Sequence, residues 1–346
     1  MAAMNISHSL DDPYLDIFHW EIFSLVNSVI ICTFIGLLGL LANGINMVVF
    51  VRQGLTTSMN ISFFSMAISD ILRILSVEWA NICFNPYIER LKAPIMFDYV
   101  FYVTGGWTVG CAARITLYIS LYITIERCIC IVFPLTVRKF ITTTRTKLVI
   151  VLIYFANTLT LVPEYMTVYL TWLYDGQRNA TVLGVGFRGN RSQTKGITFM
   201  LHVLLIVIGL FCIVVMTTVL VLQLRRQRKW RMKNSGSSLS KESLSTRDRR
   251  SAVLVIVVAT AVAVCYIPIA SLSLVTVFVP DFYVGGKYFN LFRDSWALAF
   301  LSGIINSSST ILIYYRMSSK YKETFLKLLD LQLKLQKTND NLTENG

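Results

Sequence analysis

Seven long apolar segments dominate the pattern of hydrophobic and polar positions along the chain. They cover residues 22–51, 59–84, 99–133, 147–174, 197–222, 252–279 and 295–315. Each approaches or exceeds the roughly 20 residues that a helix needs to cross about 30 Å of hydrocarbon. Helices satisfy their own backbone hydrogen bonds, which lipid cannot do for them. The pattern therefore predicts an all-α membrane protein, folded as one bundle of seven transmembrane helices.

The overall composition agrees with a lipid environment. Of the 346 residues, 55% are hydrophobic and only 15% are charged. Typical soluble domains are about 25% charged, so this chain carries more apolar surface than a water-soluble fold can bury. We therefore expect a single membrane domain rather than several soluble ones.

The distribution of the positive charge predicts the orientation. The net charge is +13, which by itself invites a nucleic-acid partner. With the N-terminus outside, however, the segments facing the cytoplasm hold 21 Lys and Arg and the outer segments hold seven. This asymmetry is the positive-inside rule. It indicates a multi-pass protein of the plasma membrane with an extracellular N-terminus and no nucleic-acid partner.

Three glycosylation triplets agree with this topology. The sequence Asn-x-Ser/Thr, which accepts an N-linked glycan, begins at Asn5, Asn179 and Asn190. All three positions fall on the side predicted to be extracellular. We therefore expect a glycoprotein.

The regions outside the spans have distinct compositions. Residues 1–21 form an outer tail, and residues 22–315 form the seven-span domain. The inner loop between spans five and six is basic at both ends and rich in serine between, so we expect disorder over 230–246 with helical edges. Its serines are either phosphorylation sites or parts of a plain linker.

An amphipathic segment follows the seventh span. Tyr321, Phe325 and Leu328 fall on one face at helical spacing, with lysines around them. We expect residues 316–335 to form an eighth helix on the inner leaflet of the lipid bilayer, followed by a cytoplasmic tail at 336–346.

Charged residues inside the spans are candidates for function. Each costs roughly 2.5–3.5 kcal/mol to insert, so such residues are rare unless they have a role. The set is Asp70, Arg73, Glu78, Arg114, Glu126, Arg127 and Glu164.

Glu126 and Arg127 end the third span on the cytoplasmic side. Asp248 precedes the sixth span on the same side, so a bridge from Arg127 to Asp248 would tie the two spans together. Breaking it would release the inner end of span six, which is a two-state element that a ligand could bias. The alternative is that Arg127 only anchors the span at the interface.

Short motifs along the spans resemble those of rhodopsin-like (class A) G-protein-coupled receptors. The sequence "ERC" is followed by Pro134 and Leu135, and "CYIP" holds Tyr266 where the family has Trp. Further matches are Asn43 in "LLANGINMVVF", Asp70 in "MAISDIL", Asn306 and Tyr314 in "NSSSTILIYY", and the segment "YKETF". The chain is most similar to molluscan chemosensory-type receptors and more loosely to invertebrate neuropeptide receptors.

The resemblance implies a signalling role. In that family, the residues matching Glu126, Arg127 and Tyr314 belong to the switch that opens the inner end of the bundle. Arg127 and Leu135 would then contact a heterotrimeric G protein when span six moves outward. A receptor kinase and arrestin are further partners that the resemblance implies.

The resemblance also implies an allosteric sodium ion but no other cofactor. The matching oxygen-bearing residues are Asp70, Thr116, Asn306 and Thr310, as a hard cation requires. Arg73 lies one helical turn from Asp70, and a salt bridge between them is the alternative.

The chain departs from the family at the outer end. The position of the usual third-span cysteine is Tyr102, and none of the seven cysteines lies in an outer loop. We therefore expect no disulfide that pins the second outer loop.

Arg114 is the main candidate for contact with a ligand. It precedes Arg127 by 13 residues, which places it about 20 Å further out along a helix. It could clamp a carboxylate or a peptide carbonyl. An internal bridge to Glu78 or Glu164 is favoured over this contact, because charges inside the membrane usually pair with each other. Neighbours expected in the same pocket are Val109, Ala113 and Tyr266.

These observations favour a chemosensory receptor for an extracellular small molecule or peptide. A neuropeptide receptor is the alternative within the class, and a seven-span transporter is the alternative outside it. An enzyme is not favoured, because the three histidines, His8, His19 and His202, form no catalytic constellation with serine, cysteine or acid.

Overall fold

The bundle is described by a computed structural model of the chain. It covers residues 22–91, 93–133, 141–176, 178–189, 196–233, 239–283 and 286–330, with the side chains of 89 and 230–248 left aside. Outside these residues lie the tails 1–21 and 331–346 and four of the predicted functional positions, Asn5, Pro134, Leu135 and Asn190.

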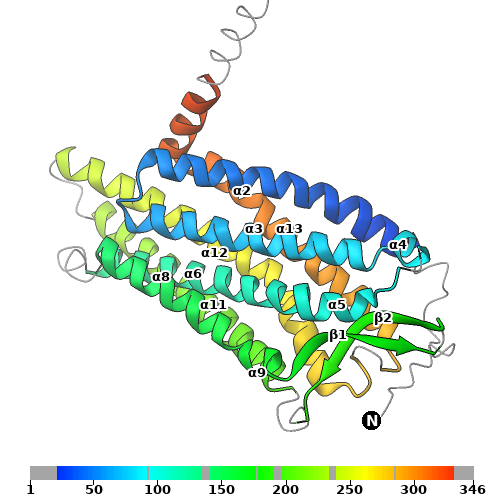
Figure 1. The fold of residues 1–346 in the computed structure, drawn as a ribbon. Coiled ribbons are helices and arrows are strands. Elements are labelled where there is room, and N and C mark those ends of the chain that lie inside the picture. The colour runs from blue at the N-terminus through cyan, green and yellow to red at the C-terminus, as the bar shows by residue number, and fades with distance from the viewer. Residues whose placement is uncertain are drawn as a thin grey trace, which may run out of the picture.

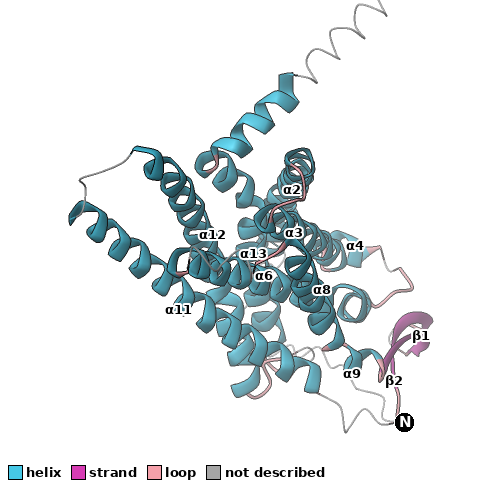
Figure 2. Cartoon of the chain, turned by 90° about the vertical axis from the view of Figure 1, so that its left-hand side faces the viewer, coloured by secondary structure: helices cyan, strands magenta, loops and turns pink. Residues whose placement is uncertain are grey.

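Seven helices in the described part are long and apolar enough to cross a membrane, which confirms the predicted fold class. Figures 1 and 2 show them as one bundle. The spans, in order, are η1 (Ser24–Cys32) with α2 (Thr33–Gln53), α3 (Ser58–Cys83), α5 (Phe97–Phe101) with η2 (Tyr102–Gly106) and α6 (Trp107–Val132), α8 (Thr143–Leu159) with α9 (Val162–Tyr165), α11 (Ile197–Lys233), α12 (Leu239–Phe278) and α13 (Phe289–Met317).

Helix α6 lies at the centre of the bundle. It packs against α3, α8, α11 and α12, and Figure 2 shows it surrounded by these helices. Most of its side chains are buried, including Arg114 and Glu126. The third span is therefore in contact with four other spans.

The fourth span is shorter than predicted. The apolar run to residue 174 predicted a continuing helix, but Val168–Asp175 forms strand β1. It pairs antiparallel with β2 (Ala180–Phe187), at the outer end of the bundle in Figure 1. The sequence "VYLTWLYD" is rich in β-branched and aromatic residues, which favour a strand over a helix.

The hairpin is attached to the segment that precedes the third span. The Leu183 N–H donates to the Pro94 carbonyl at 2.8 Å, and the Met96 N–H donates to the Leu183 carbonyl at 2.9 Å. Asn179 lies in the turn between the strands, exposed and with a positive φ of 47°. Among the predicted glycosylation sites, it is the one in the described part, and its exposure is compatible with a glycan.

Threonine caps begin two of the spans at the inner end. The Thr57 side chain accepts from the Asn60 N–H at the start of α3, and Thr142 accepts from the Arg145 N–H at the start of α8. Such caps satisfy backbone donors that have no partner inside the helix. They fix the positions of Ser58 and Thr146, which contribute to the site below.

An aromatic cluster joins the inner ends of the first, second and seventh spans to the segment after them. Phe50, Phe63, Tyr314 and Tyr321 pack with ring centroids 4.8–5.8 Å apart. The buried Tyr321 hydroxyl also donates to Asn46 Oδ1 at 2.5 Å. Tyr321 thereby attaches the segment after the seventh span to the first span.

The segment after the seventh span is helical over 319–330 in the described part. Tyr321 is buried and Phe325 packs against the same cluster, while the lysines on its other side are exposed. A hydrogen bond from Lys327 lowers the pKa of the exposed Glu323. The helix therefore has one face on the bundle and one charged face, as the pattern predicted.

The helices around the inner loop are longer than the apolar runs. Helix α11 continues to Lys233 and α12 begins at Leu239, with 234–238 outside the described residues. In Figure 1 both helices extend beyond the inner end of the other spans. The division of the chain into tail, loop and eighth helix remains a prediction.

Candidate signalling and ligand-binding site

The Glu126–Arg127 pair lies at the inner end of α6 and is part of a buried network. Arg127 Nη2 donates to Glu126 Oε1, and the Ser58 hydroxyl donates to Glu126 Oε2. Ser58 accepts from Thr146 at 2.9 Å, and Thr146 bonds to the Tyr122 hydroxyl at 2.8 Å. The acidic residue therefore joins the second, third and fourth spans and also holds the arginine.

Arg127 is held rather than freely extended. Its side chain is 14% exposed and forms an ion pair with Glu126, whose own side chain is 1% exposed. The predicted partner on span six, Asp248, has a side chain outside the described residues. The structure thus gives Arg127 an acidic partner on its own helix, and the bridge to Asp248 remains a prediction.

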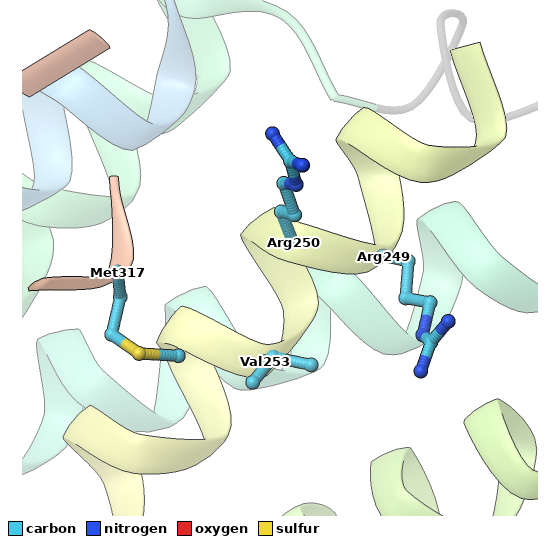
Figure 3. Close-up of a pocket in the computed structure, with 4 residues that line it drawn as sticks. All are labelled: Arg249, Arg250, Val253 and Met317. Carbon is cyan, nitrogen blue, oxygen red and sulfur yellow. The ribbon is translucent and has the colours of Figure 1, made fainter. Parts of the chain in front are cut away.

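A cavity opens at the inner end between the sixth and seventh spans. It has a volume of about 330 Å³ and is lined by Arg249, Arg250, Val253 and Met317. Figure 3 shows Met317 facing α12 across the opening, with the two arginines extending in different directions from that helix. The cavity lies at the same end of the bundle as Arg127.

The predicted switch residue Tyr314 lies beside this region. It is buried in the aromatic cluster, and its hydroxyl has no hydrogen-bond partner in the described part. A buried hydroxyl without a partner costs free energy, typically about 1–3 kcal/mol. Opening of the inner end would therefore be favoured if it gave this hydroxyl a hydrogen-bond partner.

Asp70 is buried at the centre of the bundle. Its Oδ1 accepts from the Ser307 hydroxyl at 2.8 Å and from Thr116 at 3.0 Å. Its Oδ2 has no partner among the described residues. Of the predicted sodium ligands, only Thr116 contacts Asp70 directly.

The other two predicted ligands form no hydrogen bond to Asp70 in the described part. Thr310 accepts from Asn46 at 3.2 Å, and the Asn306 side-chain nitrogen has no partner in the described part. Ser307, which was not predicted, takes the place beside Asp70. The predicted sodium site therefore stays a prediction, with Ser307 as a further oxygen beside Asp70.

Arg73 does not form the alternative salt bridge. No ion pair joins it to Asp70 in the described part. Its Nη1 donates to the Tyr266 hydroxyl at 2.9 Å, and its guanidinium lies 4.9 Å from the centre of that ring. A methyl group added at Gly303 would overlap the guanidinium, so the absence of a side chain there makes room for it.

Arg114 is fully buried where the third, fourth and fifth spans meet. Its Nε donates to Asn157 Oδ1 at 3.1 Å and its Nη2 donates to Thr160 at 2.7 Å. Its Nη1 lies 2.5 Å from His202 Nδ1, which accepts because the guanidinium can only donate. No acidic side chain forms an ion pair with it among the described residues, so the predicted bridge to Glu78 or Glu164 is wrong.

The two glutamates lie in other environments. Glu164 is buried in α9 and accepts from the Tyr102 hydroxyl at 2.5 Å. Glu78 accepts from Asn81 at 3.3 Å, between the first two spans. The structure does not bring these carboxylates together with Arg114.

The three remaining predicted pocket residues are buried in the packed core. Val109 belongs to one apolar cluster and Ala113 to another. Tyr266 is fully buried, and its hydroxyl donates to the Ala113 carbonyl at 3.0 Å. Ala113 and Tyr266 thus join the third and sixth spans at the residue immediately before Arg114.

A comparison with known families decides the class of protein. A family model described as serpentine type 7TM GPCR chemoreceptor Srw matches residues 30–332. The chain belongs to this Srw chemoreceptor family. No curated protein matches the chain.

Membership gives this chemoreceptor its general function. It is a multi-pass membrane protein and a chemosensory G-protein-coupled receptor, so a G protein, a ligand and the membrane are its partners. The chemosensory prediction is confirmed, and the receptor belongs to a class without enzymatic activity. The transporter alternative is not favoured.

Sequence reasoning missed the neighbours of Arg114 in this chemoreceptor. His202 is the single histidine of the fifth span, and Asn157 and Thr160 lie in an apolar fourth span. Polar residues at such positions are unusual in lipid and tend to face the bundle interior. These polar residues within apolar spans could have indicated a buried polar cluster. The sequence alone, however, does not show which of them are in contact.

Proposed function

We propose that the receptor transmits binding at its outer half to a G protein through Arg127. The ion pair with Glu126 holds Arg127 in the resting state. When α12 moves outward, Arg127 leaves Glu126 and becomes part of the surface that contacts the G protein. The N-terminus faces the outside of the plasma membrane.

The buried network at Glu126 is the observation that carries this proposal. A charge-assisted hydrogen bond in a buried site is stronger than an exposed one, so it defines a distinct resting arrangement. The inner cavity between α12 and α13 supplies a second feature of a docking end. Outward movement of α12 would widen it beside Arg250 and Met317.

The bridge to Asp248 belongs to the same proposal. Asp248 lies at the start of the sixth span on the inner side, one residue before Arg249 at the cavity. An alternative acid on span six would let the arginine exchange partners as that span moves. The finer resemblance to rhodopsin-like and molluscan receptors supports this movement. Leu135, which follows Pro134 after the third span, would contact the G protein in the same step.

We also propose that a sodium ion can act as an allosteric ligand at Asp70. The unpartnered Oδ2 is the carboxylate oxygen that would face it, with the hydroxyls of Thr116 and Ser307 beside it. A cation there would neutralise a buried negative charge and favour the resting packing of the second and seventh spans.

Replacing Arg127 tests the proposed switch. The full chain carrying Arg127→Ala should reach the cell surface and lose G-protein activation by at least about tenfold, because the docking cation is gone. Guanine-nucleotide exchange on a co-expressed Gα subunit measures the loss. Arg52→Ala, which removes an exposed inner arginine at the end of α2, is the matched control.

Two results would decide against the proposal. Normal exchange by Arg127→Ala at equal surface amount would remove Arg127 from the docking surface. An equal loss in Arg52→Ala would indicate a general effect of inner-leaflet charge instead of a specific switch.

A further inference from the structure

We propose that Arg114 is the binding site for an anionic ligand, specifically the carboxylate of a small organic acid. The inference rests on the proposed function, because it names the ligand class for that receptor. It follows from the environment of Arg114, which the sequence alone did not give.

Among the described residues, the charge of Arg114 has no counter-ion. Arg114 is 0% exposed, and its nitrogens donate hydrogen bonds to Asn157, Thr160 and His202. Each of these partners accepts a hydrogen bond but carries no negative charge. A buried charge is expensive unless an opposite charge accompanies it. An anion that enters beside Arg114 would remove that penalty.

The neighbouring arginines show that this is a particular feature of Arg114. Arg127 has Glu126 as an acidic partner. Arg73 forms no ion pair in the described part either, but the buried Asp70 lies one turn away on its own helix and its guanidinium lies over the face of Tyr266. Arg114 is thus the fully buried arginine of the described part that lacks an acid both on its own helix turn and among its hydrogen-bond partners.

The chemistry of the site selects a carboxylate. A planar guanidinium matches two carboxylate oxygens with two parallel N–H groups. The longest of its present bonds, from Nη2 to the Asn157 carbonyl, is 3.4 Å, so this carbonyl is the acceptor that a ligand oxygen can replace at least cost. Apolar side chains of the surrounding cluster, including Ile206 and Leu117, suit the hydrocarbon part of an organic acid.

Gly110 lies on the outer side of Arg114, one turn along α6. A methyl group added there would be 3.0 Å from His202 Cε1 and 3.9 Å from Arg114 Nη1. The absence of a side chain at Gly110 therefore leaves room for the His202 ring, which accepts from Arg114.

Binding at Arg114 would also reach the helices that surround it. Its partners come from α8 and α11, and Tyr266 of α12 bonds to Ala113 immediately before it. A carboxylate that draws the guanidinium away from Thr160 or His202 changes contacts with the fourth and fifth spans. The sixth span is connected through the adjacent residue.

Thermal unfolding of the purified full-length receptor in detergent tests the site. Sodium butyrate, sodium hexanoate and sodium benzoate are compared with butyramide, hexanamide and benzamide, with sodium chloride matching the ionic strength. We expect the acids to raise the melting temperature of the receptor and the amides and chloride to leave it unchanged.

Arg114→Gln separates ligand binding from a structural role. Because this substitution removes an uncompensated charge, we expect the unliganded variant to melt at or above the wild-type temperature and to lose the response to the acids. Arg114→Lys keeps the cation and should retain a reduced response. Arg52→Gln, at an exposed arginine, is the control and should behave as wild type.

The opposite results would overturn the inference. A purely structural Arg114 predicts that Arg114→Gln melts well below wild type and that no acid shifts the wild-type receptor. Equal shifts in wild type and Arg114→Gln would place the anion elsewhere. If Arg114→Gln does not fold, the wild-type comparison of acids with amides and the Arg114→Lys response decide in the same way.

Nucleotide exchange on Gα by the same wild-type preparation distinguishes this inference from the proposed function. Exchange that depends on Arg127, without any acid-specific shift, overturns the ligand class alone. An acid-specific shift that Arg114→Gln abolishes, with exchange that is insensitive to Arg127, overturns the proposed switch alone.

Discussion

Arg114 and Arg127 lie on the same helix but have opposite surroundings. Arg127, at the inner end, forms an ion pair with Glu126 and is partly exposed. Arg114, in the middle of the bundle, has no exposure and only neutral hydrogen-bond partners. Arg127 therefore has a counter-ion in this structure, whereas Arg114 has none among the described residues.

The same residue type therefore has different surroundings at different depths. Near the interface a guanidinium has water and acidic neighbours within reach, so its state depends on which partner it holds. In the core a cation is costly to bury unless an anion accompanies it. One helix therefore carries a candidate ligand contact and a candidate output contact about 20 Å apart, given its rise per residue.

Removing the acid from Arg127 is expected to have the largest effect. Glu126→Gln makes the inner arginine resemble the outer one, because both then have neutral partners. The loss of a charge-assisted bond worth about 1.5–3 kcal/mol should raise agonist-independent signalling roughly tenfold or more. Nucleotide exchange without added ligand measures it, with Glu323→Gln, at an exposed acid, as control. Unchanged basal exchange would mean that Glu126 does not hold the resting state.

The third buried arginine offers an intermediate case. Tyr266→Phe keeps the ring near Arg73 but removes the hydroxyl that accepts from Arg73 and donates to Ala113. A further unpartnered donor on a buried cation should lower the free energy of unfolding by about 1–3 kcal/mol. Thermal unfolding in detergent measures this loss. A variant as stable as wild type would show that the ring alone is enough for Arg73.

Supplying an acid to Arg114 should have the smallest effect. Asn157→Asp places a carboxylate about where Asn157 Oδ1 now accepts from Nε at 3.1 Å, so the outer arginine comes to resemble the inner one. The gain at the guanidinium exceeds the loss of the bond from Asn157 to the Ile153 carbonyl by about 1 kcal/mol. The variant should melt slightly higher and respond less to organic acids. A lower melting temperature with an intact response would argue that the charge of Arg114 was already compensated.

The patterns that depend on local chemistry were predicted well. The seven spans follow from the apolar runs, and the helix after the seventh span follows from the spacing of Tyr321 and Phe325. The end of the fourth span was missed because an apolar run with β-branched and aromatic residues satisfies a hydropathy criterion whether it is helix or strand. The hairpin is formed only where β1 finds β2.

The sequence indicated which charged residues are buried better than it indicated which residues they contact. Arg114, Asp70 and Glu126 were selected because ionisable groups are rare in lipid, and all three are buried. Their partners were mostly different from those expected, with His202 and Asn157 at Arg114 and Ser307 at Asp70. A spacing of residues places two groups on one helix face, but it does not determine how neighbouring helices are rotated.

The sequence by itself determined that this chain is a seven-span bundle and which charges it carries into the membrane, and it predicts which way the chain inserts. These properties follow from hydropathy and charge, which each segment has before any helix meets another. The tertiary structure decided which charge has a counter-ion. That property depends on the rotation and depth of neighbouring helices, so Glu126 holds Arg127 while Arg114 meets only neutral side chains.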